Sequence, residues 1–360
     1  MLCSGVFFID GIKRDKWIWS GDAYQSLFVN RYLTADVEIE RRTLLALRGN
    51  ENMTTYINTI IDYTLYWILG VWAHYESCGD LEFIRQIWSK MTSLMEFCKD
   101  QTDSHGFFTG REGDWVYIDW ADLDKEGPLC AEQMLYLRCL DVMAQMSSLC
   151  GYAEAERRYR EQYESLRIQV DRVFWDEEKH AYIDSFISGR RHVTRHANIF
   201  AVLFGIADET RKREIAEYVL LNEEVPQITT PYFKFYELDA LCRMGYLKEV
   251  LDVIREYWGG MLQRGAVTFW EEYDPDVPQE QQYDMYGDRF GKSLCHAWGA
   301  SPVYLLARYF VGLEITDAAK GEYKLDPHLE FFRELDCVLP AGACQLHIMW
   351  DGKTLHTETI

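Results

Sequence analysis

The densest group of residues that could do chemistry lies near the start of the chain, in segment 10–22. Its sequence, DGIKRDKWIWSGD, places the carboxylates of Asp10, Asp15 and Asp22 among glycines, tryptophans and the cation Arg14. A loop that contains glycine can direct several carboxylates towards one point. Aromatic neighbours and like charges raise the pKa of a carboxylic acid, so that it can donate a proton near neutrality, while an adjacent arginine lowers it. The segment therefore predicts an acid site centred on Asp15.

Each of these side chains also has a purely structural interpretation. Asp22, with Gln25 three residues later, fits a helix N-cap of capping-box form as well as it fits a ligand role. Asp10 could end a strand or form an Asx-turn, and Arg14 could form an ordinary surface ion pair with Asp15. Spacing alone leaves both interpretations open.

Two further groups lie far downstream. In 267–274, VTFWEEYD, Glu271 follows Trp270, and a carboxylate beside aromatic rings suits a sugar pocket, because rings stack on the apolar face of a pyranose. In 293–300, SLCHAWGA, His296 lies near an expected helix N-terminus, which favours the neutral imidazole as a hydrogen-bonding partner for a hydroxyl. The structural alternatives are a core tryptophan at a strand edge and a structural histidine.

Other motifs are weaker or missing. Trp115, in the run REGDW, could form a pocket wall or pack against a turn, and Arg195-His196-Ala197-Asn198 fits the start of a helix better than a ligand set. The chain contains no H-E-x-x-H, EF-hand loop, P-loop, dinucleotide fingerprint or G-x-S-x-G elbow. We therefore expect no metal and no cofactor, and nucleotide chemistry and serine hydrolysis are disfavoured.

The elements that must position these residues are mainly helical. Between residues 22 and 312, apolar positions return at intervals of three and four, which predicts about ten amphipathic helices. Glycine links such as Cys150-Gly151-Tyr152 end one helix where the next begins, and such short links make antiparallel hairpins. The predicted helices are 23–46, 54–77, 80–100, 129–150, 153–174, 194–207, 209–220, 231–244, 247–262 and 293–311.

Three long aromatic loops, 102–128, 175–193 and 264–292, separate the hairpins, and we expect them to line a site. After residue 315 the pattern alternates like strands, with turns at 340–342 and 351–352, which predicts the start of a β-domain. Serial hairpins could close into a toroid or spread as a solenoid. No fixed repeat of 34 or 40 residues recurs, so we favour the toroid.

Composition restricts the partners. The chain has 360 residues, with 58 Asp and Glu against 37 Lys and Arg, a net charge of −21. This charge repels nucleic acid and anionic membrane surfaces, and no basic run offsets it, so we expect neither partner. No signal peptide and no membrane-length apolar run is visible, and the ten cysteines are scattered singly. The given sequence alone predicts a cytoplasmic protein. If upstream sequence is missing, the protein could be periplasmic or secreted, so we make no prediction of its localisation.

Five motifs, in a fixed order within residues 5–312, are together similar to those of a known protein family. They are DGIKRDKWIWSGD, REGDWVYIDW, TPYFKFYELDAL, VTFWEEYD and SLCHAWGASP. In this order they resemble the α-L-rhamnosidases of glycoside hydrolase family 78. The resemblance implies an (α/α)6 toroid of six helical hairpins followed by a β-sandwich. It also implies hydrolysis of terminal α-L-rhamnosidic bonds with inversion of configuration, without a cofactor.

The resemblance also implies roles for single residues. Asp15 falls on the general acid and Glu271 on the general base, while Asp10 and Asp22 fall on carboxylates that bind the sugar, and His296 falls on a histidine that contacts it. In such a single displacement the acid protonates the leaving oxygen while the base takes a proton from the attacking water.

Further positions and one departure follow from the same resemblance. Trp19, Trp115 and Trp270 would shape the pocket around the methyl group of rhamnose, and Arg14 completes the expected substrate-binding set. Many family members carry glutamate at the acid position, whereas this chain has the shorter Asp15. The shorter side chain must approach the glycosidic oxygen more closely, which bears on activity rather than on fold.

The expected organisation is a six-hairpin catalytic domain over 1–315 and the start of a C-terminal β-sandwich over 316–360. Ten predicted helices instead of twelve, and a first motif at residue 10, suggest an N-terminally truncated toroid that lacks its first helices. Two rival functions stay open: a weak or inactive rhamnose-binding fragment, and a related toroid glycosidase that acts on fucosides or uronides. A non-enzymatic solenoid scaffold is the least favoured alternative. The aglycone, the linkage and the oligomeric state are not predicted.

Overall fold

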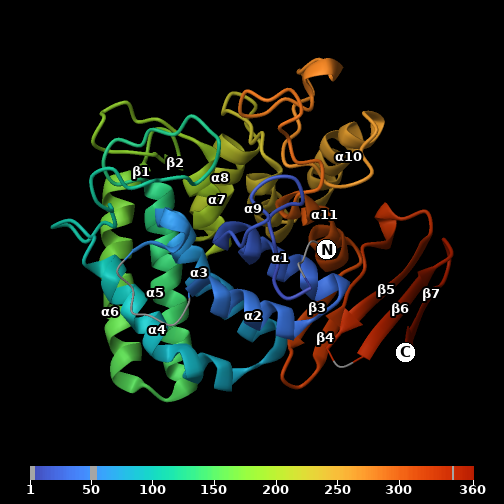
Figure 1. Ribbon diagram of the computed structural model, residues 1–360, viewed down its shortest axis with the longest axis horizontal. Coiled ribbons are helices and arrows are strands. Elements are labelled where there is room, and N and C mark those ends of the chain that lie inside the picture. The colour runs from blue at the N-terminus through green and yellow to red at the C-terminus, as the bar shows by residue number, and fades with distance from the viewer. Residues whose placement is uncertain (1–4, 49–54, 343) are drawn as a thin grey trace. The chain divides into compact units, whose positions relative to one another are not determined.

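The computed structural model describes residues 5–48, 55–342 and 344–360. These residues are mainly helical and end in short strands (Figure 1), as the sequence predicts. None of the described helices is long and apolar enough to cross a membrane. The α-helices are α1 (Ser20–Leu33), α2 (Val37–Arg48), α3 (Ile61–Cys78), α4 (Leu81–Lys99), α5 (Cys130–Cys150), α6 (Ala153–Phe174), α7 (Arg195–Leu203), α8 (Glu209–Ile215), α9 (Pro231–Arg243), α10 (Leu247–Gln263) and α11 (Ser301–Leu305).

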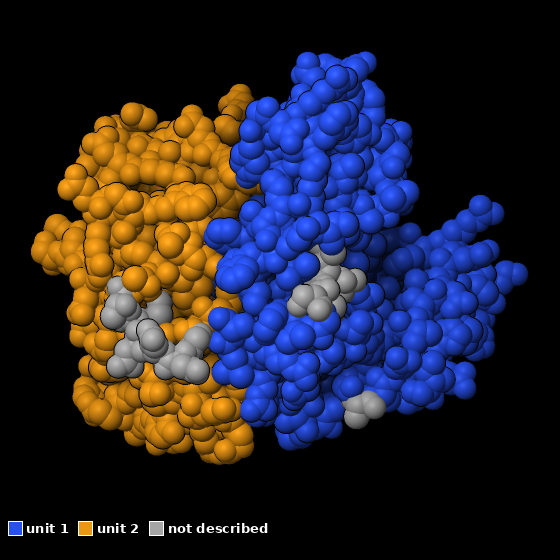
Figure 2. All heavy atoms as spheres, viewed as in Figure 1, with its two compact units in different colours: residues 1–46, 73–80, 246–360 blue, residues 47–72, 81–245 orange. Residues whose placement is uncertain are grey.

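The chain folds into two compact units, which Figure 2 shows in different colours. The described residues of 1–46, 73–80 and 246–360 form unit 1, and those of 47–72 and 81–245 form unit 2. The candidate chemical segments, 10–22 and 267–300, both fall within unit 1. The geometry between these two segments can therefore be described inside one compact body.

Unit 2 is built from helical hairpins. α5 packs against α6 along its length, and the two helices are joined at Gly151, whose φ of 77° allows the left-handed turn that ends α5. α7 packs on both α5 and α9. The predicted loop 175–193 begins with two short antiparallel strands, β1 (Trp175–Asp176) and β2 (Ala181–Tyr182). The hairpin prediction is confirmed here.

In unit 1 the predicted helix 23–46 is wrong, because two helices occupy this range. α1 ends at Leu33 and α2 begins at Val37. Ala35 between them has a φ of 51°, and the Asp36 carboxylate accepts hydrogen bonds from the backbone N–H groups of Glu38 and Ile39. The apolar positions of α1 and α2 continue in phase across this turn, so periodicity alone did not reveal the break.

The predicted helix 293–311 also starts too early. Residues 293–296 are not helical, because His296 donates its backbone N–H to the Phe269 carbonyl oxygen and pairs with Gly11 as a β-bridge. A 3₁₀ turn (Ala297–Ala300) follows, then α11, then a π-helical turn (Leu306–Phe310). α1 packs against α11 and against the 3₁₀ turn, so the first motif and the last are brought together by this packing.

The C-terminal strands form two antiparallel sheets. β3 (Leu313–Asp317) pairs with β4 (Glu322–Leu325), and β5 (Leu335–Ala341), β6 (Cys344–Trp350) and β7 (Leu355–Thr359) form a three-stranded sheet. The turn predicted at 351–352 lies between β6 and β7. The turn predicted at 340–342 begins too early, because Pro340 and Ala341 are the last residues of β5 and pair with Gln345 and Cys344. β3 begins at Leu313, slightly before the change of pattern expected at 315. The division into domains at that residue stays a prediction.

Candidate active site

The first motif forms a loop that closes on itself before α1. The backbone N–H of Asp10 donates to the Trp17 carbonyl oxygen at 3.1 Å, and the Trp17 N–H donates to the Asp10 side chain at 2.9 Å. At the tip of the loop Asp15 and Lys16 have φ values of 40° and 52°. This backbone leaves Asp15 exposed at the tip, whereas Asp10 is buried at the base. Two carboxylates of one segment therefore have different environments.

Asp22 is not an N-cap. It lies in the first turn of α1, whose N-cap position is Trp19. The buried Asp22 side chain instead contacts the Nε2 atom of His296 at 3.1 Å, and the Nδ1 atom of His296 has no hydrogen-bond partner among the described residues. A Cβ built on Gly11 would lie 3.0 Å from that Nδ1, so the glycine allows the loop to approach the imidazole. His296 therefore joins the two motifs through Asp22.

Burial changes the proton affinity of both buried carboxyl groups. It raises the pKa of Asp10 from 3.8 to about 6, with a further rise from the nearby Asp22, while the hydrogen bond from Trp17 acts in the opposite direction. Burial also raises the pKa of Asp22, and the hydrogen bond with His296 partly offsets this rise. The pair can therefore offer a protonated and an ionised oxygen at mildly acidic pH, which suits hydrogen bonding to neutral hydroxyl groups.

The raised pKa of Asp10 predicts a pH-dependent cost to stability. Between about pH 4 and pH 6 the folded protein retains a proton that the unfolded chain releases, so the stability that this group contributes falls as the pH rises through this window. Asp10→Asn removes the titration and keeps an oxygen acceptor for Trp17. We expect the melting temperature of the variant, relative to wild type, to increase by about 1–3 °C from pH 4 to pH 7.

The measurement is thermal unfolding of both proteins across that pH range. Asp122→Asn, at an exposed position of unit 2, serves as the matched control and should show a constant difference from wild type. A constant difference for Asp10→Asn as well would show that the Asp10 carboxyl titrates normally.

Glu271 is buried and its carboxylate is held from two sides. Its Oε2 atom accepts the backbone N–H of Ser293 at 2.8 Å, and its Oε1 atom pairs with the Arg14 guanidinium. Its backbone N–H donates to the Ser293 carbonyl oxygen, and its own carbonyl oxygen accepts the indole N–H of Trp298 at 2.8 Å. These contacts fix the position of the carboxylate.

Arg14 connects the first motif to the downstream loop. Besides Glu271, it donates to the Gly291 carbonyl oxygen and contacts the Met285 sulfur at 3.4 Å, and it lies over the Tyr286 ring at 4.8 Å from the centroid. The alternative of an Arg14–Asp15 surface pair is not what the structure shows, because the guanidinium is directed at Glu271.

Asp15 and Glu271 act electrostatically on the same phenol. The pKa of Tyr286 is raised to about 12, first by burial, then by the charge of Glu271, and also by that of Asp15, while Arg14 lowers it. The tip of the first loop and the buried glutamate therefore both lie near one aromatic ring. Glu271 also raises the pKa of Asp22, which places all these charges in one cluster.

The tryptophans differ in their surroundings. Trp270 is buried and packs edge-on against Tyr273 and Tyr283, as the core alternative anticipates. Trp19 is half-buried at the start of α1. Trp115 lies in unit 2, is 52% exposed, and pairs with Ile60 as a β-bridge. The structure thus brings the acidic cluster and two of the three tryptophans into unit 1, and leaves Trp115 outside it.

Several contacts were not predicted from the sequence. Arg14 or Glu271 is contacted by Ser293, Met285, Tyr286 and Gly291, and none of these four is among the site residues predicted from the sequence. No group of three or more histidine, cysteine or acidic side chains in the described residues could hold a metal ion. The carboxyl groups of this cluster can exchange protons with a bound neutral ligand.

The chain is similar to a known protein family and to several solved structures. The model of the bacterial alpha-L-rhamnosidase six-hairpin glycosidase domain matches residues 5–310. A family 78 rhamnosidase from Bacillus sp. GL1 superposes with a TM-score of 0.85 at 24% identity, covering 98% of this chain and 39% of that one. A Klebsiella oxytoca rhamnosidase with rhamnose bound gives a TM-score of 0.70 at 25% identity, covering 84% and 60%.

A third structure, a Streptomyces avermitilis α-L-rhamnosidase in complex with L-rhamnose, gives a TM-score of 0.72 at 14% identity, covering 99% of this chain and 34% of that one. The chain spans less than two thirds of the length of each of these structures. The mainly α, six-hairpin fold class predicted from the sequence is confirmed.

Proposed function

Since the chain belongs to the bacterial α-L-rhamnosidase six-hairpin glycosidase family, we propose that it hydrolyses terminal α-L-rhamnosidic bonds of oligosaccharides or rhamnosides with inversion of configuration. One observation carries the proposal. The exposed Asp15 and the buried, arginine-held Glu271 come from distant segments of one unit and act on the same Tyr286. Such a pair has the two contrasting environments that an acid and a base require.

Asp15 is the proposed general acid. Its exposed carboxyl group can take up a proton from solvent and deliver it to the glycosidic oxygen, and no ion pair joins it to the neighbouring Arg14. Glu271 is the proposed general base. Arg14 and the Ser293 N–H stabilise its carboxylate, and each carboxylate oxygen has a second lone pair that can accept a proton from a water molecule. Inverting pairs stand about 6.5–9.5 Å apart, which leaves room for that water.

Asp10 and Asp22 are proposed to hold hydroxyl groups of the sugar, because both are carboxyls with raised pKa beside the acid–base pair. His296 belongs to the same sugar-binding group and contributes through Asp22, which its Nε2 contacts. Arg14 acts by holding Glu271. Trp19 and Trp270, which both lie in unit 1, are proposed to shape the pocket. In this proposal residues 1–315 supply the catalytic domain and 316–360 begin a C-terminal β-sandwich domain.

The product anomer provides the test. Purified protein is incubated with a panel of aryl glycosides, and the first sugar released is followed by NMR. We expect hydrolysis of the α-L-rhamnoside with β-L-rhamnose appearing first and the α-anomer growing in by mutarotation. The α-anomer appearing first would show retention and contradict the mechanism.

The same panel separates the rival functions. Faster release from fucosides or uronides would assign a different sugar specificity. If rhamnose binds by calorimetry but no rhamnoside is cleaved, the chain is a binding fragment rather than a hydrolase. The chain covers 39% of the Bacillus structure and 60% of the Klebsiella structure. The assay must therefore distinguish a hydrolase from a binding fragment.

A further inference from the structure

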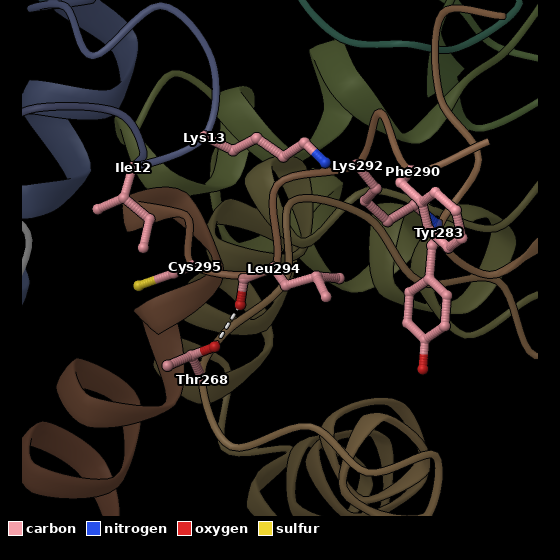
Figure 3. Close-up of a pocket in the computed structure, with 8 residues that line it drawn as sticks. All are labelled: Ile12, Lys13, Thr268, Tyr283, Phe290, Lys292, Leu294 and Cys295. Carbon is pink, nitrogen blue, oxygen red and sulfur yellow. Dashed lines mark hydrogen bonds between the residues drawn. The ribbon is translucent and has the colours of Figure 1, made fainter. Parts of the chain in front are cut away.

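A pocket lies in unit 1, between segments that neighbour the acidic cluster. Its volume is about 490 Å³, within the range of pockets that bind small molecules. Figure 3 shows the side chains that line it, and most are apolar or aromatic, including Ile12, Tyr283, Phe290 and Leu294. None of the carboxylates proposed for catalysis or sugar binding lines it. The pocket is therefore a separate feature that the proposed chemistry has not used.

The walls of this pocket are the immediate neighbours of the catalytic residues. Lys13 precedes Arg14 on the loop that carries Asp15. Lys292 and Leu294 flank Ser293, whose backbone holds Glu271. The pocket thus shares both of its supporting segments with the acid–base pair.

The pocket differs from the rest of the protein in charge. The chain carries a net charge of −21, yet the lining contains two lysines and no carboxylate. The Lys292 side chain is only 4% exposed, and its one ion-pair contact among the described residues is with Glu272 at 3.6 Å, longer than a hydrogen bond. Lys13 is exposed and forms no ion pair with a described residue. Figure 3 shows the Lys13 side chain extended towards the Lys292 and Phe290 side of the pocket.

A buried ammonium group in an apolar pocket needs an anionic partner, since burial without one is costly. Glu272, which is one-third exposed, supplies such a charge at 3.6 Å from outside the pocket lining, and a carboxylate bound inside the pocket would be a second partner for Lys292. Tyr283 and Phe290 supply rings on which a planar group can stack. The lining therefore combines the features that recognise an aromatic acid.

We propose that this pocket binds the leaving group of the substrate and selects aglycones that carry a carboxylate on an aromatic ring, with Lys292 as the main partner of the carboxylate. This inference rests on the proposed rhamnosidase activity, because it assigns the substrate class of the same site. It adds a specificity-determining residue that takes no part in proton transfer.

The test compares two matched substrates, 4-carboxyphenyl and 4-carbamoylphenyl α-L-rhamnoside. They have nearly the same shape, and the ratio of their kcat/KM values measures the preference for the charge. In Lys292→Met we expect this ratio to fall about tenfold relative to wild type, because a hydrogen bond to a charged group is lost. The double variant Lys292→Met with Glu272→Gln removes both charges and guards against misfolding from an unpaired Glu272.

Lys248→Met is the matched control, because Lys248 is an exposed lysine of α10 that pairs with Asp252. It should leave the ratio unchanged. A ratio that Lys292→Met and the double variant also leave unchanged would overturn the proposal, even if the protein is a good rhamnosidase.

If the proposed rhamnosidase activity is wrong, the experiment gives a different result from the one that overturns the pocket. In that case neither rhamnoside is cleaved by wild type, and the pocket is tested by calorimetry with free 4-hydroxybenzoate and 4-hydroxybenzamide. Tighter binding of the acid, abolished by Lys292→Met, supports the pocket. Equal binding of acid and amide, or no binding of either, rejects it.

Discussion

Glu271→Gln is expected to lower kcat on an aryl α-L-rhamnoside by about 10²- to 10⁴-fold, the usual contribution of a general base. The amide has the size of the carboxylate and can still accept the hydrogen bond from Ser293, so the local fold should persist. It cannot take a proton from the attacking water. Water attack is required whatever the aglycone, so the loss should be similar for substrates with good and poor leaving groups.

The control for this variant is Glu280→Gln, an exposed glutamate in the same loop, which should retain wild-type kcat. Melting temperature and rhamnose affinity confirm that both proteins are folded. Full activity in Glu271→Gln would remove Glu271 from the chemistry and with it the proposed acid–base pair.

Most of the helical architecture could be predicted from the sequence, because each helix has its own apolar periodicity. α6 begins and ends where the pattern predicts, and Gly151 marks the turn before it. The break between α1 and α2 could not be predicted in the same way. It depends on the Asp36 side chain and on a left-handed Ala35, which change the backbone without disturbing the apolar spacing.

The residue types of the site could also be predicted from the sequence. Which of these residues contact one another could not. Asp22 has the sequence context of an N-cap, yet α1 begins two residues before it, and its carboxylate is directed to His296. The partner of Arg14 is 257 residues away in sequence. Contacts between such distant segments arise from the packing of α1 against α11, which periodicity does not encode.

The partner of Arg14 could not be identified from local spacing. Its position next to Asp15 in sequence indicates an effect on that carboxyl group and leaves open a surface ion pair between the two residues. The guanidinium instead lies against Glu271 and contacts Tyr286, so its charge supports the base. The turn at Asp15 and Lys16 separates the two neighbouring side chains, and this separation is a property of backbone conformation.

Asp15→Asn is expected to show the complementary pattern. On an alkyl α-L-rhamnoside, whose leaving oxygen needs a proton, we expect kcat/KM to fall by about 10²- to 10⁴-fold. On 2,4-dinitrophenyl α-L-rhamnoside the leaving group departs as a stable anion, so the loss should be much smaller. Asparagine tolerates the positive φ of this position as well as aspartate does, so backbone strain does not explain a loss.

Asp15→Glu is the matched variant, because it keeps the carboxyl group and extends it by one methylene, to the residue that many family members carry. It should retain measurable activity on the alkyl substrate, where Asp15→Asn does not. If Asp15→Asn lost the same activity on both substrates, protonation of the leaving oxygen would not be the step that Asp15 serves. The difference between the two substrates thus assigns the acid independently of the base, since Glu271→Gln should impair both substrates equally.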